Sequence, residues 1–249
     1  MPRKNSISTW ISDPVRLTVA LTMVAFAVSA CGENPLAGFT NSGSKAAQTE
    51  ITVTADRIVL RGPTGFCVDR ESSKHRPAQA FVVFGNCAAI SGDEELPQPF
   101  VNAIATASVL PAGKNGPTIG ESETALEEFF NSESGKAVLS ATGDAGTVEI
   151  LDSFTRNGAF FVHARDTGAP LLAGTTNTYW RGYFDVKNSV VALSVLGLKN
   201  TPISSADGLQ TLYDFGNVLM ESQAVATKNA VRAPVENVAE TGLLRRILG

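Results

Sequence analysis

The chain has few of the residues that enzymes most often use for catalysis. Its 249 residues include 2 histidines and 3 cysteines. They contain no Gly-x-Ser-x-Gly elbow, no His-Glu-x-x-His motif, no P-loop and no Gly-x-Gly-x-x-Gly fingerprint. Because His75 and His163 are the only imidazoles, a histidine-rich metal site cannot be built. The sequence therefore predicts no metal, no cofactor and no recognisable catalytic set.

An excess of basic residues is also lacking. The chain carries 20 Lys and Arg residues against 24 Asp and Glu residues, a net charge of −4. Nucleic-acid-binding domains present a basic surface, so we predict no nucleic-acid partner. The acidic run Asp93-Glu94-Glu95 lacks the alternation of a calcium-binding loop and is predicted to be a solvated loop.

Long hydrophobic runs are missing except for one, at residues 17–30. It follows a basic head with Arg3, Lys4 and Arg16, and it ends in small residues. This order is typical of a secretory signal. The run is shorter than the roughly 20 residues that a comfortable membrane span requires. We therefore predict a signal peptide over residues 1–30.

The end of this run, Val28-Ser29-Ala30-Cys31, resembles the lipobox of bacterial lipoproteins. The resemblance implies that the Cys31 sulfur receives a diacylglyceryl group and that cleavage before Cys31 removes the signal peptide. Two or three acyl chains would anchor the protein stably in a membrane. Gly32 follows the cysteine instead of Asp, which in that family favours the periplasmic face of the outer membrane. The alternative is an ordinary cleaved signal in which Cys31 has no role.

The two remaining cysteines form a pair if Cys31 is lipidated. An oxidising periplasm favours a disulfide between Cys67 and Cys87. Closing a loop of about 20 residues stabilises a fold by roughly 3 kcal/mol in the chain-entropy model. A reactive thiol is the alternative, but there is no Cys-x-x-Cys motif and no histidine beside either cysteine.

The composition changes along the chain and predicts four parts. Residues 1–30 are the signal peptide, and residues 31–49, rich in small and polar side chains, are a flexible tether. Residues 50–225 form a single α+β domain, and residues 226–249 form a weakly amphipathic tail. Arg245 and Arg246 in that tail could contact a membrane or a partner, whereas packing on the domain or disorder are the alternatives.

Alternating apolar residues and frequent turn signals predict a mostly antiparallel sheet with two main helices packed on one face. Asn157-Gly158 is the strongest hairpin signal. The predicted helices span 122–131 and 204–222, and 70–79 is predicted to be a loop. The predicted strands span 51–56, 66–69, 80–90, 103–110, 137–141, 147–155, 159–166, 178–186 and 189–197. Residues 56–61 are predicted to be either a second short strand or part of the first.

Both predicted helices have an apolar side. Leu126, Phe129 and Phe130 recur at helical spacing and are expected to face the core. In the second helix, Ser204 with Asp207 three residues later resembles a capping box. An apolar stripe follows it, made of Leu209, Leu212, Phe215, Val218 and Leu219.

Two predicted strands carry the candidate binding residues. Alternation places His163 and Arg165 on one face of the first strand, and Tyr179, Arg181 and Tyr183 on one face of the second. If the strands pair in a register that joins these faces, they form a basic aromatic surface for an anionic or planar ligand. The alternative is an ordinary amphipathic sheet with the core residues on its other face, namely Trp180, Phe184 and Val186.

The sequence therefore favours a lipid-anchored envelope protein that acts as a non-catalytic binding or assembly module, with a possible envelope protein partner. An envelope hydrolase with an unrecognised site is the second hypothesis, in which His163 would act with Asp166 or a nearby serine. These two residues point to opposite faces of a regular strand, which counts against that pair. A purely structural envelope protein is the third hypothesis.

Overall fold

Antiparallel strands are the most frequent elements in the part of the chain that the computed structural model describes, residues 47–113 and 116–232. The predicted signal peptide, Cys31, most of the tether and the end of the tail lie outside it. The strands are β1 (Glu50–Val53), β2 (Ile58–Arg61), β3 (Phe66–His75), β4 (Ala80–Asn86), β5 (Ala103–Pro111), β6 (Val148–Arg156), β7 (Ala159–Asp166), β8 (Thr175–Val186) and β9 (Ser189–Leu198). The helices are α1 (Cys87–Ser91), α2 (Glu123–Asn131), α3 (Glu133–Leu139), α4 (Ser205–Arg232) and two 3-10 turns at Gly120–Ser122 and Ala145–Thr147.

A 7-stranded sheet in the order β3-β4-β5-β9-β8-β7-β6 forms the centre of the described residues. All of its strand pairs are antiparallel, and β1 and β2 pair separately. The Asn157-Gly158 turn joins β6 to β7 with φ values of 53° and 76°, as a tight hairpin turn of type I′ requires. The predicted α+β class with an antiparallel sheet is confirmed.

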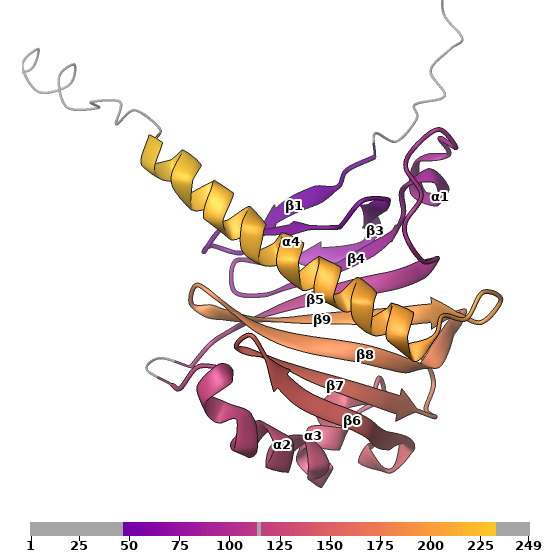
Figure 1. The fold of residues 1–249 in the computed structure, drawn as a ribbon, viewed down its shortest axis with the longest axis vertical. Helices are drawn as coiled ribbons and strands as arrows, with labels where there is room; N and C mark the ends of the chain where they lie inside the picture. The colour runs from indigo at the N-terminus through magenta and orange to yellow at the C-terminus, as the bar shows by residue number, and fades with distance from the viewer. Residues whose placement is uncertain (1–46, 114–115, 233–249) are drawn as a thin grey trace, which may run out of the picture. The chain divides into compact units, whose positions relative to one another are not determined.

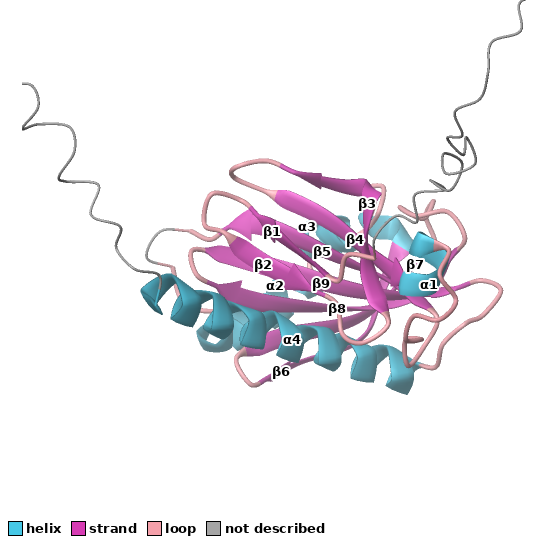
Figure 2. Cartoon of the chain, turned by 90° about the horizontal axis from the view of Figure 1, so that it is seen from above, coloured by secondary structure: helices cyan, strands magenta, loops and turns pink. Residues whose placement is uncertain are grey.

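Helix α4 covers one face of this sheet, which we call the α4 face (Figures 1 and 2). Its residues Leu212, Phe215 and Leu219 are buried against the strands. The hairpin β1–β2 lies on the same face, and the Gln223 side chain bonds both the N–H and the C=O of Val59 in β2. The predicted capping box is present, since Ser204 Oγ accepts the Asp207 N–H and donates to the Asp207 carboxylate.

Helices α2 and α3 pack on the opposite face, where Phe130 and Leu139 join a second core cluster with Phe160 and Val162 of β7. The expectation that the main helices share one face is therefore wrong. The reason is that β7 is apolar on both faces: Phe161, which alternates with Phe160 and Val162, belongs to the α4-face cluster. A strand of that kind does not indicate which helix meets which face.

Several segments differ from their predicted structure. Residues 137–141 were expected to form a strand, but most of them belong to α3, because Ser132 accepts the Gly135 N–H and caps a helix there. Gly135 also lets α3 approach α2, since a Cβ there would lie 1.9 Å from the Phe129 carbonyl oxygen. Phe129 itself is 40% exposed, although it was expected in the core.

The predicted strand 80–90 ends early, at Asn86, because the Asn86 side chain accepts the Ala88 N–H and starts helix α1 at Cys87. Two further differences are extensions. Strand β3 continues to His75 through part of the predicted loop, with a register shift between Asp69 and Lys74. Helix α4 continues to Arg232, so it crosses the boundary predicted between residues 225 and 226. No helix within the described residues is both long enough and apolar enough to span a membrane.

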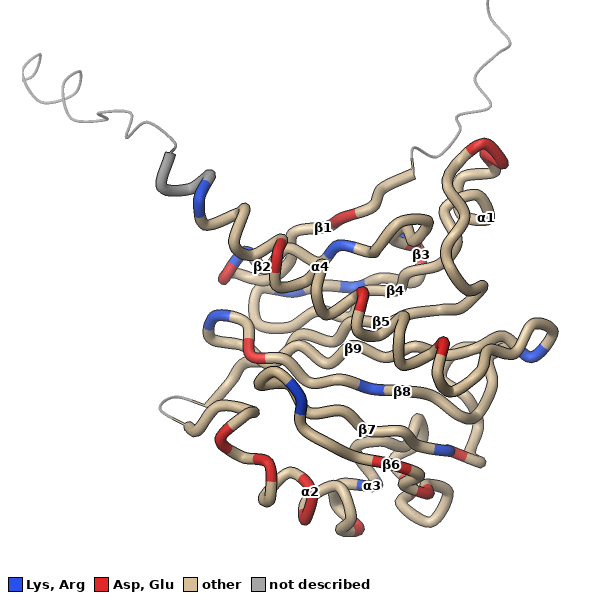
Figure 3. Tube along the Cα trace, viewed as in Figure 1, with Lys and Arg blue, Asp and Glu red and all other residues tan. Residues whose placement is uncertain are grey.

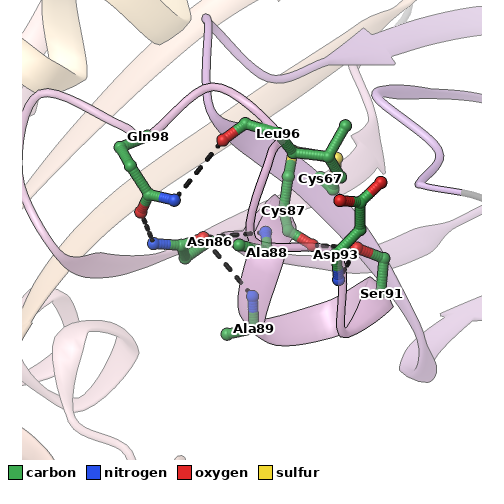
Figure 4. Close-up of a disulfide and its surroundings, with 9 residues drawn as sticks. All are labelled: Cys67, Asn86, Cys87, Ala88, Ala89, Ser91, Asp93, Leu96 and Gln98. Carbon is green, nitrogen blue, oxygen red and sulfur yellow. Dashed lines mark hydrogen bonds between the residues drawn. A yellow bond between two sulfur atoms is a disulfide. The ribbon is translucent and has the colours of Figure 1, made fainter.

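The predicted disulfide is present between Cys67 of β3 and Cys87 at the start of α1 (Figure 4). Their Cα atoms are 4.8 Å apart and both residues are buried. Asn86 caps α1 by accepting the Ala88 N–H, and its amide donates to Gln98. The disulfide thus links the edge strand β3 to helix α1, which directly follows β4.

Candidate functional site

A cavity of about 340 Å³ lies on the sheet face opposite α4, and we call it the sheet-face cavity. Strands β5, β9 and β8 form its floor, while the end of α3 and the segment 170–172 line its sides. The floor carries small side chains, among them Ser108, Ala192 and Ser194, so space remains beside the aromatic core under α2. This volume is near the lower end of the range of about 300–1,000 Å³ for ligand pockets.

Strand register places a polar row across the cavity floor. Thr106 of β5 pairs with Ser194 of β9, and Ser194 pairs with Arg181 of β8. Residues paired in this way point to the same face, and all three line the cavity. Strands β5 and β9 carry no charged residue, as Figure 3 shows, so Arg181 supplies the positive charge of the floor.

The Arg181 guanidinium is partly buried and only partly used. Its Nε donates to Ser194 Oγ at 2.8 Å, and its Nη1 makes a long contact of 3.4 Å with the Val138 carbonyl oxygen. It also lies 5.2 Å from the centroid of the Tyr179 ring, within cation–π range. A guanidinium has five N–H donors. Within the described residues Arg181 has no ion pair, so donors remain for a ligand.

Two tyrosines flank Arg181 and differ in their partners. The Tyr179 hydroxyl donates to the Leu139 carbonyl oxygen at 2.6 Å, and burial raises its pKa to about 12. The Tyr183 hydroxyl is buried beside the Arg181 guanidinium and donates no hydrogen bond to an acceptor among the described residues. Burial raises the pKa of Tyr183 as well, with the Arg181 charge opposing the shift. Both hydroxyls therefore remain protonated at neutral pH, and that of Tyr183 is a free donor.

Asp166 is the carboxylate among the cavity-lining residues, but it is already engaged. It accepts hydrogen bonds from the Ala141 N–H at 2.8 Å, the Thr147 hydroxyl at 2.6 Å and the Gly168 N–H at 2.9 Å. Burial alone would raise the pKa of Asp166, but these hydrogen bonds outweigh burial and lower it. Asp166 thus holds the loops at the cavity wall and is no ion-pair partner of Arg181.

The five residues predicted to form a basic aromatic surface lie on two faces. Strand β7 pairs with β8 so that His163 is opposite Trp180, and Arg165 is opposite Thr178. His163 and Arg165 therefore share the α4 face, whereas Tyr179, Arg181 and Tyr183 line the sheet-face cavity. The register that would have joined all five is absent, and three of them remain together.

His163 is held by aromatic stacking. Its ring lies 4.4 Å from that of Trp180 at an interplanar angle of 7°. Burial lowers the pKa of His163, which Asp152 opposes and Arg165 reinforces. Arg165 forms an exposed ion pair with Glu149 at 3.0 Å. These contacts give both residues local roles on the α4 face, away from the cavity.

The geometry offers no support for a hydrolytic site that uses His163. Asp166 lies on the opposite face of β7, where it bonds Ala141, Thr147 and Gly168. Among the described residues, no group of three or more His, Cys, Asp and Glu side chains could hold a metal ion. At the cavity itself, the Asp166 carboxylate accepts a hydrogen bond from the Thr147 hydroxyl, and His163 is not among the lining residues.

Sequence reasoning missed Thr106 and Ser194 as parts of the site, and it considered Asp166 only as a partner of His163. Thr106, Ser194 and Asp166 are polar residues at buried positions of apolar strands. A buried polar residue is unusual, so this is the one feature that could have identified them. The feature is useful only once the strand register is known, because only the strand pairing shows that Thr106, Ser194 and Arg181 form one row. Comparisons of this chain with protein-family models, curated proteins and solved structures found no match.

Proposed function

We propose that this protein is a lipid-anchored binding protein of the bacterial cell envelope that holds a small ligand in the sheet-face cavity. The observation that carries the proposal is the Arg181 guanidinium, which has unused donors and no ion pair among the described residues at the floor of an apolar cavity. Convergent polar groups in a pocket with mostly apolar walls are the usual mark of a ligand site.

The burial pattern supports a ligand over a purely structural role. Burying a polar group without a partner is unfavourable, so native proteins satisfy nearly all such groups. Here the Tyr183 hydroxyl and part of the Arg181 guanidinium line the cavity with donors that, outside this pair, reach no acceptor among the described residues. A bound molecule with hydrogen-bond acceptors would satisfy both groups.

The neutral fluorophore 1-N-phenylnaphthylamine tests the binding proposal, because its emission rises in an apolar site. We expect saturable binding to the purified domain and loss of that binding in Ala192→Phe, which fills the cavity. The matched control is Ala224→Phe, at an exposed position of α4. Equal binding by all three proteins, with circular dichroism showing that each is folded, would place the probe elsewhere and refute the proposal.

The anchor is a separate part of the proposal and rests on the lipobox resemblance of residues 28–31. Attachment through Cys31 would place the protein at the periplasmic face of the outer membrane. Labelled palmitate should enter the wild-type protein in a bacterial host and should be absent from Cys31→Ser. Label in both proteins, or in neither, would leave binding in the cavity standing but would remove the anchor.

A further inference from the structure

We infer that the sheet-face cavity takes a monoanionic amphiphile with one aliphatic chain, its carboxylate on Arg181 and its chain along the apolar walls. The inference rests on the proposed function, since it names the class of ligand that the cavity binds. Three independent features of the cavity carry it: its charge balance, its donor geometry and its rim.

The charge balance calls for an anion. Asp166 and Arg181 are the charged residues that line the cavity. The Asp166 carboxylate is occupied by three donors within 2.9 Å, whereas Arg181 has no ion pair among the described residues. A positive charge taken from water is stable only when it is paired. The site therefore favours a ligand with one negative charge and disfavours cations.

The donors suit a carboxylate. With Nε bound to Ser194 and Nη1 only loosely bound to Val138, the outer edge of the guanidinium is available to two ligand oxygens. Arginine and carboxylate groups match in this bidentate geometry. The Tyr183 hydroxyl lies beside Arg181 and can donate to the same group.

The rim suits an aliphatic chain. Leu110, Val138 and Leu171 line the cavity and are 51%, 56% and 61% exposed, respectively. Single exposed apolar residues are ordinary, but a group of them around one opening marks a binding surface. Phe81 and Leu196 continue the apolar wall inward. A chain whose carboxylate reaches Arg181 would cover these side chains as it leaves the cavity.

Three ligands with the same ten-carbon chain and different head groups test this inference. Decanoate, 1-decanol and decyltrimethylammonium would each compete with 1-N-phenylnaphthylamine for the wild-type protein. We expect decanoate to bind at least about tenfold more tightly than 1-decanol, as charge-assisted hydrogen bonds require, and decyltrimethylammonium to bind most weakly. Equal affinities would overturn the inference while leaving the binding proposal intact.

Variants locate the carboxylate. In Arg181→Gln the affinity for decanoate should fall to that for 1-decanol, while 1-decanol binds as before. The control Arg165→Gln removes an arginine from the opposite face and should change neither affinity. Tyr183→Phe should lower the affinity for decanoate but not that for 1-decanol, by a smaller factor than Arg181→Gln. It serves as the second variant if Arg181→Gln does not fold. Unchanged decanoate binding in both Arg181→Gln and Tyr183→Phe would refute the inference, and absence of all probe binding would remove the proposed function with it.

Discussion

The two faces of the central sheet are packed in opposite ways. On the α4 face, Phe215 meets Phe66 and Phe84 edge to face at 4.9 and 5.4 Å, and α4 packs along the strands. On the other face, aromatic packing is confined to the region of α2 and β7, and the floor of β5 and β9 stays open above Thr106 and Ser194. One face is therefore covered by a long helix, whereas the other combines a smaller buried core with the cavity that we propose as a binding site.

The largest effect on stability is expected from a substitution on the α4 face. Phe215→Ala would remove a buried ring that two others contact, and we expect the free energy of unfolding to fall by about 3–5 kcal/mol. Phe129→Ala, at a position 40% exposed, is the control and should change it by less than about 1 kcal/mol. Urea denaturation measures both. A similar loss in the two variants would show that the faces do not differ in this way.

Asp166→Asn should have the next largest effect. Both carboxylate oxygens of Asp166 accept hydrogen bonds, so an amide nitrogen in place of one of them would set a donor opposite a donor. We expect the free energy of unfolding to fall by about 1–3 kcal/mol. The folded pKa of Asp166 is lowered, so its contribution is present above its ordinary value of 3.8 and is lost as the pH falls. Asp152→Asn, at an exposed position, should show no comparable loss at neutral pH.

Arg181→Met should separate binding from stability. A methionine fills similar space without a charge, so the loss of the bonds to Ser194 and Val138 is offset by removal of the cost of burying an unpaired charge. We expect the free energy of unfolding to change by less than about 1 kcal/mol in denaturant titration, although the variant no longer distinguishes decanoate from 1-decanol. A loss above about 2 kcal/mol would instead assign Arg181 to holding the sheet together.

The smallest effect on stability is expected from His163 on the α4 face. Because its pKa is lowered in the fold from 6.5, the unfolded chain binds more protons near that pH. Stability should therefore fall slightly as the pH drops through 6.5 and level off below the folded pKa. His163→Gln should lack this component in the difference between the two pH–stability curves. A steeper fall in the variant than in the wild type would contradict the stacked, neutral imidazole.

Alternation and turn chemistry predicted most of the strands. The limits of β7 and the turn at Asn157-Gly158 were correct because both depend on neighbouring residues alone. Helix α3 was missed because Ala137, Val138 and Leu139 form a short apolar run that fits either period, and the Ser132 cap decided it.

The site could be predicted only in part for a related reason. Tyr179, Arg181 and Tyr183 share a face by alternation within β8, and that expectation holds. Which residues of other strands join them depends on register, and β7 is apolar on both faces, so a shift by one residue looks equally favourable in the sequence. Ser194 and Thr106 enter the site through the same long-range pairing.

The Gln223 amide has a consequence for how copies of this protein meet. Its Oε1 accepts a hydrogen bond from the Val59 N–H, and its Nε2 donates one to the Val59 C=O. The side chain therefore takes the place that a neighbouring strand would have beside β2. An uncovered strand edge is a template for pairing with a second chain. One glutamine on a helix thus occupies the Val59 backbone groups, which leaves fewer free partners at that edge for a strand of a second copy.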